Sequence, residues 1–202
     1  MHPNKAFAWE DREAALQFVS ERAFAHIFTA PDAGLFVVHA PVLVTETGRV
    51  QFHVSRRNRI AEHLPLRPVL ISVSGREAYQ SANWYVTDNQ VPTWHYEAVE
   101  VEGEARMLSP EGLVDLLDRL SERFENELQP EQPWTRGKMT HGKFEAMTRA
   151  IVGFEVDPED VRGTRKFNQH KAGEDLAATI AGQQCAGRAD IVEAIREMTK
   201  GG

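Results

Sequence analysis

The sequence predicts an α+β protein built on a closed or split antiparallel β-barrel with peripheral helices. It contains about six short β-rich segments, and most of the connections between them are only long enough for a turn. Short connections favour antiparallel pairing, since parallel strands need a long crossover, and no crossover helix separates the successive segments. The chain of 202 residues suits one domain with an added helical layer.

The first third of the chain predicts one helix followed by strands. Glu10 to Arg22 places apolar residues at helical spacing. The segment 49–54 alternates Val50, Phe52 and Val54 with polar residues, which is the pattern of a half-buried strand. Strands are expected at residues 24–29, 35–45, 49–54 and 68–74, with turns at 31–34 and 47–48 and a short helix or turn at 58–64.

Residues 75–93 differ in composition from their surroundings, because they are rich in aromatic and turn-forming residues. We therefore expect a long loop there, and long loops are often functional. Alternation resumes over 94–107, which predicts another strand. Gly103 inside this segment suggests a β-bulge.

The rest of the chain predicts helices around two strands. Ser109 and Pro110 have the residue types of an N-cap and a first helical position, and a leucine stripe follows them. Further elements are expected as a helix at about 140–149, strands at 150–156 and 161–167, and a helical tail from Glu174 onward that ends in Gly201 and Gly202. This organisation divides the chain into a barrel domain over 1–170 and a C-terminal helical tail over 171–202.

The charge and cysteine content of the chain limit the kinds of molecule that it is expected to bind and the compartment in which it is expected to work. The net charge of −7 disfavours attraction to nucleic acid or to an anionic membrane, so direct nucleic-acid binding is not expected. A single cysteine, Cys185, allows no internal disulfide, and no apolar run approaches the length of a membrane helix or a signal-peptide core. We expect a cytoplasmic protein. Its histidines and cysteine show no metal-binding spacing.

One segment suggests an anion site. His53, Ser55, Arg56 and Asn58 lie where a strand ends and a turn or helix begins. Backbone amides at such a start attract anions, and an arginine fork suits a phosphate. A solvated basic turn is the alternative interpretation of the same residues.

Two other segments also have two interpretations. The aromatic residues between Tyr79 and Tyr96 suit either a flat heteroaromatic ligand or the packing of a core or a dimer interface. The basic run at 162–170 is either a solvated surface or a second phosphate contact.

Several motifs together resemble the PaiB-type family of FMN-binding negative transcriptional regulators, over residues 1 to about 180. The resemblance rests on family-like segments in the family order. These are Pro3 with Phe7, His39-Ala40-Pro41, the segments 52–59, 79–85 and 91–96, Ile-Val-Gly-Phe-Glu-Val at 151–156, and 166–170. The chain departs from the family pattern at Ser55, Arg59, His95, Asn168 and His170.

The resemblance implies a split β-barrel of the flavin-reductase or pyridoxamine-oxidase type, which forms a homodimer with FMN between the subunits. Two histidines, His39 and His95, are candidates to donate hydrogen bonds to the flavin. The expected cofactor-binding residues are His53, Ser55, Arg56 and Asn58 for the phosphate, Thr93, Trp94 and His95 for the ring or ribityl chain, and Lys166 and Gln169 from the C-terminal strand or its partner copy.

The residues single out no catalytic acid or base. Three functions remain open on the sequence: a flavin-dependent regulator or redox protein, an FMN-dependent reductase or oxidase or a haem-handling relative, and an interaction module without cofactor.

Overall fold

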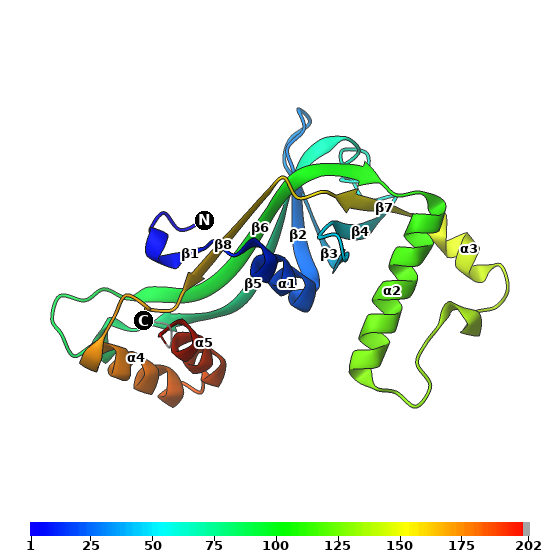
Figure 1. The fold of residues 1–202 in the computed structure, drawn as a ribbon. Helices are drawn as coiled ribbons and strands as arrows, with labels where there is room; N and C mark the ends of the chain where they lie inside the picture. Colours follow the sequence, from blue (N-terminus) through cyan, green and yellow to red (C-terminus); the bar gives the residue numbers. More distant parts are fainter. Residues whose placement is uncertain (200–202) are drawn as a thin grey trace. The chain divides into compact units, whose positions relative to one another are not determined.

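The computed structural model describes residues 1–199 (Figure 1). By contacts the chain divides into two compact units. The barrel unit comprises Leu16–Val73 and Val101–Val161, and the helical unit comprises Met1–Ala15, Ser74–Glu100 and the chain from Arg162 onward. The elements are η1 (Lys5–Phe7), β1 (Ala8–Trp9), α1 (Arg12–Arg22), β2 (Phe24–Thr29), β3 (Phe36–Val44), β4 (Val50–Ser55), β5 (Arg67–Gln80), η2 (Ala82–Trp84), β6 (Thr93–Met107), α2 (Pro110–Leu128), η3 (Arg136–Lys138), α3 (Lys143–Thr148), β7 (Ile151–Val156), β8 (Asp160–Lys166), α4 (Gly173–Cys185) and α5 (Ala189–Thr199).

The barrel unit is an antiparallel barrel. Its strands follow the order β6-β5-β2-β3-β4-β7, and an additional pairing between β6 and β7 closes the ring. Sequential strands pair through short connections, as in β2 with β3 and β3 with β4. The α+β class and the antiparallel barrel with peripheral helices are therefore confirmed.

The barrel interior is filled by the alternating residues of its strands. Val50, Phe52 and Val54 of β4 are all buried, as their spacing predicts. Phe52 lies opposite Phe154 of β7, and their rings stack with centroids 5.6 Å apart. Burial of each phenylalanine side chain contributes about 1.5–3 kcal/mol to folding.

Gly103 permits a close approach of two backbones inside the barrel unit. A Cβ atom at this position would lie 2.4 Å from the backbone oxygen of Asp157. The nearby backbone N–H of Glu159 donates to the carbonyl of Glu102 over 2.9 Å. The glycine that suggested a bulge is thus required because the segment before β8 crosses β6 here.

Helices α2 and α3 lie beside β7, and α2 also contacts β4 (Figure 1). The hydroxyl of Ser109 accepts a hydrogen bond from the N–H of Gly112 over 3.1 Å, which confirms the predicted N-cap. The leucine stripe of α2 packs Leu116 and Leu120 against Leu43 of β3. The helix expected at 140–149 is shorter than predicted, since α3 covers only Lys143–Thr148.

In the helical unit, the expectation of a long loop at 75–93 is partly wrong. Strand β5 continues to Gln80, η2 follows, and only the remaining residues up to 92 form the loop. The strand continues through polar sequence because Arg76 is satisfied there: its backbone N–H and its guanidinium both donate to Glu97 of β6. This partner is distant in sequence, so composition alone favoured a loop.

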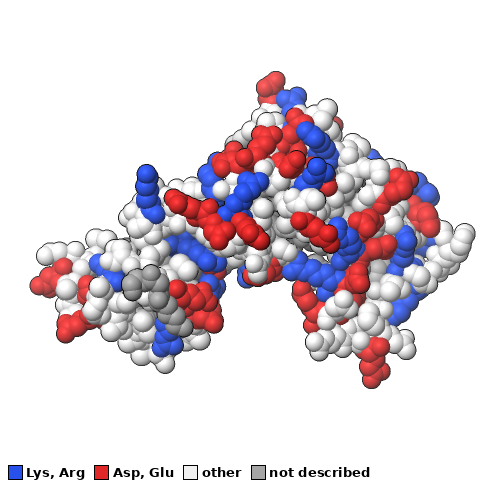
Figure 2. All heavy atoms as spheres, in the orientation of Figure 1, with Lys and Arg blue, Asp and Glu red and all other residues white. Residues whose placement is uncertain are grey.

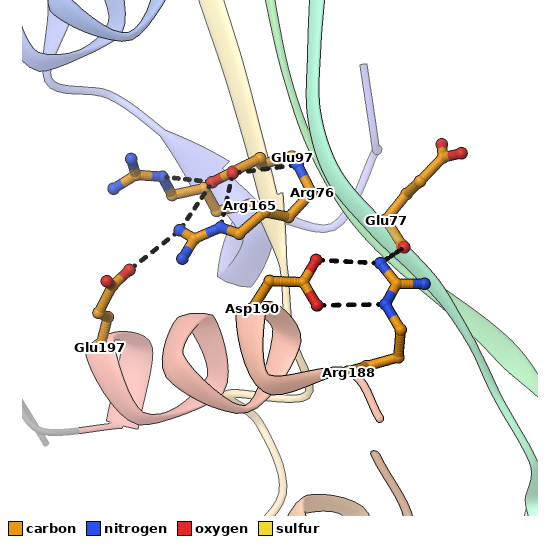
Figure 3. Close-up of polar contacts among 7 residues, drawn as sticks. All are labelled: Arg76, Glu77, Glu97, Arg165, Arg188, Asp190 and Glu197. Carbon is orange, nitrogen blue, oxygen red and sulfur yellow. Dashed lines mark hydrogen bonds and ion pairs between the residues drawn. The ribbon is translucent and has the colours of Figure 1, made fainter. Parts of the chain in front are cut away.

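Glu97 is the centre of a buried ion network (Figure 3). Its side chain is only 3% exposed, and its carboxylate lies 2.9 Å from Nε of Arg76 and 3.5 Å from Nε of Arg165. Arg76 also reaches Glu197 of α5 at 3.0 Å. Although burial alone disfavours its charged form, the carboxylates of Glu97 and Glu197 raise the pKa of Arg76. The network joins β5, β6, β8 and α5.

A second contact fixes the start of α5. Arg188 forms two hydrogen bonds with the carboxylate of Asp190, at 3.1 and 3.0 Å, and also donates to the backbone carbonyl of Glu77 (Figure 3). Apolar contacts reinforce this attachment, since Ile191 and Ile195 are buried with Phe167. The tail is thus helical as expected, as α4 and α5 joined by a turn, while Gly201 and Gly202 lie outside the described residues. The domain boundary at 170 stays a prediction.

Candidate functional site

The turn after β4 holds the first group of expected site residues. Its backbone amides are already used: Arg56 N–H donates to the carbonyl of Ala150 over 2.9 Å, and Asn58 N–H donates to the carbonyl of Ser55 over 2.9 Å. The hydroxyl of Ser55 accepts from Arg57 N–H over 3.2 Å. These three amides are therefore committed within the turn, and the segment 58–64 forms turns and no helix. Any anion would be held here by side chains.

Arg56 is exposed, and its side chain is partly fixed. Its Nε donates to the carbonyl of Arg149 over 3.1 Å. Within residues 1–199, its two terminal guanidinium nitrogens make no hydrogen bond or ion pair, so they remain available for a phosphate. The neighbouring Asn58 accepts from the N–H of Ile60 over 3.2 Å through Oδ1. The turn thus presents a positioned guanidinium at the end of a strand.

His53 lies apart from the exposed turn residues, because its ring is turned toward helices α2 and α3. It pairs with Gly153 of β7 on the outer side of the barrel and lines a cavity of about 340 Å³. Its Nδ1 is buried and has no hydrogen-bond partner among residues 1–199. Burial lowers the pKa of His53, which keeps the ring neutral at neutral pH.

The second group of expected residues lies in the helical unit, where β6 begins and β8 ends. Lys166 Nζ donates a short hydrogen bond to Oγ1 of Thr93, and it also lies 5.9 Å from the ring centre of Phe7. Burial lowers the pKa of Lys166. The structure therefore brings Thr93 and Lys166 together.

Trp94 and His95 point to opposite faces of β6. Trp94 is 55% exposed and meets the ring of Tyr79 edge-on, with centroids 6.0 Å apart. His95 is fully buried, donates a hydrogen bond from Nε2 to Oε1 of Gln80 over 3.0 Å, and stacks on Phe167. Burial lowers the pKa of His95 to about 4. The side chain of His95 is thus a neutral core group in this structure.

The side chain of Gln169 forms hydrogen bonds with the backbone near the end of β8. Its Oε1 accepts from the N–H of Phe167 over 2.8 Å, and its Nε2 donates to the carbonyls of Arg165 and Ala6 over 2.6 and 3.1 Å. The side chain therefore holds η1 against the end of β8. His39, the other candidate flavin donor, lies on the exposed face of β3 with its ring 4.6 Å from that of His26.

The donor set fits FMN. A dianionic phosphate needs cationic and hydrogen-bonding side chains, and the exposed guanidinium of Arg56 and the hydroxyl of Ser55 supply them in the barrel unit. In the helical unit, the ammonium of Lys166 lies beside Thr93, and the indole of Trp94 is exposed. Of the nine expected residues, four lie in the barrel unit, where His53 is turned away from the other three, and five lie in the helical unit.

No binding role was expected for residues 129–150, although a helix was expected at about 140–149. In the structure, Trp134, Met139 and Phe144 from this segment line the same cavity as His53. These aromatic and methionine residues, spaced through an otherwise polar segment, could have indicated an apolar binding surface. Among residues 1–199, no group of three or more histidine, cysteine or acidic side chains is placed to hold a metal ion. Over the same residues, no helix has the length and apolarity needed to span a membrane.

Comparison with known proteins agrees with this geometry. A family model described as "Putative FMN-binding domain" matches residues 1–160. The chain is 28% identical over 187 residues to "Protease synthase and sporulation protein PAI 2" of Bacillus subtilis. The aligned region covers 89% of this chain and 87% of that protein.

Solved structures share the fold at low sequence identity. The FAD and heme binding protein from Mycobacterium smegmatis superposes with a TM-score of 0.60 at 14% identity, covering 85% of this chain and 79% of that one. The flavocytochrome Anf3 from Azotobacter vinelandii superposes with a TM-score of 0.59 at 16% identity, covering 86% and 73%. With the family match over most of its length, the chain belongs to the FMN-binding domain family, of the PaiB type, and its cofactor is FMN.

Proposed function

We propose that this chain works as a homodimeric flavoprotein that binds one FMN per subunit and uses it as a redox group or a regulatory signal. The observation that carries this proposal is the turn after β4, where Arg56 offers two free terminal nitrogens at the end of a barrel strand. Family membership supports FMN as the ligand that such a turn receives.

The side chains of the turn would hold the phosphate. Arg56 would form two parallel charge-assisted hydrogen bonds, with Ser55 and Asn58 as short donors beside it. Its Nε bond to Arg149 orients the guanidinium plane before any ligand arrives, which lowers the cost of binding.

Within the helical unit, a second set of residues is proposed to contact flavin. Thr93 and Lys166 would donate to the ribityl chain or ring edge, and Trp94 would cover an apolar surface. Bound FMN supplies a ring that exchanges electrons singly or as hydride. His95 would act from behind β6 by fixing the position of its neighbours, because its ring is buried in the core.

Exposed aromatic side chains on the barrel support assembly as a homodimer. Phe24 and Phe28 of β2 are 55% and 39% exposed, and Val37 of β3 is 46% exposed. Phe28 lies directly opposite Val37 on the paired strands, and the ring pair of His26 and His39 lies on the same face. A second copy of this face would remove these side chains from water, and two-fold pairing is the commonest symmetry.

The similarity to the Bacillus subtilis sporulation protein favours a second candidate function, a flavin-dependent regulator without turnover. Such a regulator would act through a partner rather than by direct DNA binding. The net charge is −7, and acidic and basic side chains alternate over the surface seen in Figure 2.

Reduction of the bound flavin distinguishes the two functions. The purified protein, loaded with FMN, is mixed with NADH or NADPH without oxygen, and the visible flavin band is followed. Rapid bleaching supports a redox enzyme, whereas a flavin that only a chemical reductant bleaches supports the regulator. Absence of saturable FMN binding would overturn both.

A further inference from the structure

We propose that the cavity between the barrel and helices α2 and α3 is a second ligand site, for a small neutral aromatic molecule with one hydrogen-bonding group. The cavity lies entirely within the barrel unit and has a volume of about 340 Å³. Its apolar walls come from α2, from the segment before α3, from α3 and from β7, as Leu117, Trp134, Met139, Phe144 and Ile151.

The other polar side chains that line this cavity already have a partner. The hydroxyl of Ser121 donates to the carbonyl of Leu117 over 2.8 Å, and that of Thr148 donates to the carbonyl of Glu145 over 3.1 Å. Asp118 is paired with Arg136 at 3.4 Å.

His53 Nδ1, by contrast, is buried without a partner among residues 1–199. A buried polar atom in this state is costly, and a ligand that supplies the missing hydrogen bond removes that cost.

The chemistry of the cavity excludes the flavin ring as its best occupant. The pyrimidine edge of a flavin carries several hydrogen-bonding atoms, which need several protein partners when they are buried. In this cavity the one unpartnered buried atom, Nδ1 of His53, belongs to a wall of mostly aromatic and methionine side chains. Such a wall suits a flat apolar molecule. Burial lowers the pKa of His53, so a neutral ligand matches the neutral ring.

The wall formed by residues 129–148 allows a ligand to enter. It is held by surface contacts, such as the hydrogen bond of 2.8 Å from Trp134 N–H to Glu125 and the guanidinium of Arg136 at 5.6 Å from the ring centre of Phe144. Trp134 is 39% exposed and Met147 is 56% exposed, so both side chains reach the cavity from its rim. Few buried contacts oppose local opening of such a segment.

N-phenyl-1-naphthylamine tests this inference. The dye is neutral and aromatic, carries one N–H group, and brightens in apolar surroundings. We expect one saturable dye site per chain, with equal affinity before and after FMN loading, and energy transfer from tryptophan that Trp134→Phe clearly reduces. Displacement of the dye by FMN, or energy transfer that Trp134→Phe leaves unchanged, would overturn the inference.

Paired variants locate the dye. Met139→Lys puts a charge into the cavity and should weaken dye binding at least about tenfold, whereas Met107→Lys, at an exposed methionine of β6 outside the cavity, should leave it unchanged. His53→Phe keeps the ring and removes the hydrogen bond, which should cost about fivefold. Wild-type affinity in Met139→Lys, or equal losses in both lysine variants, would contradict the inference. FMN binding is measured separately, so failure here leaves the proposed function intact.

Discussion

Replacement of Arg56 by alanine should weaken FMN binding by about ten- to a hundredfold. The substitution removes the guanidinium whose terminal nitrogens are free, and a hydrogen bond to a charged group contributes about 1.5–3 kcal/mol. Each 1.4 kcal/mol corresponds to roughly a factor of ten in affinity. The fold should survive, because Arg56 is exposed and loses only its bond to the carbonyl of Arg149.

Arg57 provides the matched control. Its side chain is exposed and makes no hydrogen bond or ion pair within residues 1–199, and its backbone N–H bond to Ser55 does not depend on the side chain. Arg57→Ala should therefore bind FMN nearly as the wild type does.

The assay is quenching of flavin fluorescence, with riboflavin as the second ligand. Riboflavin lacks the phosphate, so its affinity should be almost the same in all three proteins. An Arg56→Ala protein that binds FMN as tightly as the wild type would refute the phosphate assignment and direct attention to Lys166. Equal losses of FMN and riboflavin would indicate a damaged fold.

Three further outcomes follow from the structure. Burial lowers the pKa of His95 from 6.5 to about 4, so its contribution to stability is complete above about pH 6.5 and is lost as the pH falls toward 4. Between about pH 7 and pH 5 urea denaturation should show a loss of about 2 kcal/mol, which is absent in His95→Gln. Arg76→Leu leaves the buried carboxylate of Glu97 without its main partner and should lower the unfolding free energy by about 3 kcal/mol. Arg119→Ala, which breaks only an exposed pair with Asp115, should change it by less than about 0.5 kcal/mol. Phe24→Asp should convert a dimer into a monomer in light scattering, while Leu128→Asp, at the exposed end of α2, should not. A dimer that persists in Phe24→Asp would contradict the assigned face.

Local patterns predicted the elements whose signals lie within a few residues. The alternation of Val50, Phe52 and Val54 identified β4, and Ser109 with Pro110 marked the start of α2. Both signals reflect backbone geometry, which short sequences encode directly. The order of the strands depends on pairing between segments that are distant in the sequence. For this reason the sequence predicted the class of barrel but not the register of its strands.

Features of the site that depend on contacts between distant residues could not be predicted from the sequence. The extension of β5 depends on the pairing of Arg76 with Glu97, two residues on different strands. The turn after β4 was expected to offer free amides, but the carbonyl of Ala150 and the turn itself use them. The opposite orientations of Trp94 and His95 follow from strand alternation, which the ligand assignment had not applied.

Native mass spectrometry of the protein with FMN tests the central claim most directly. Each chain has a mass of 22.8 kDa. We predict a species of two chains with two FMN molecules, which loses flavin before it separates into subunits. A monomer, or a dimer that carries no flavin in excess FMN, would contradict the account.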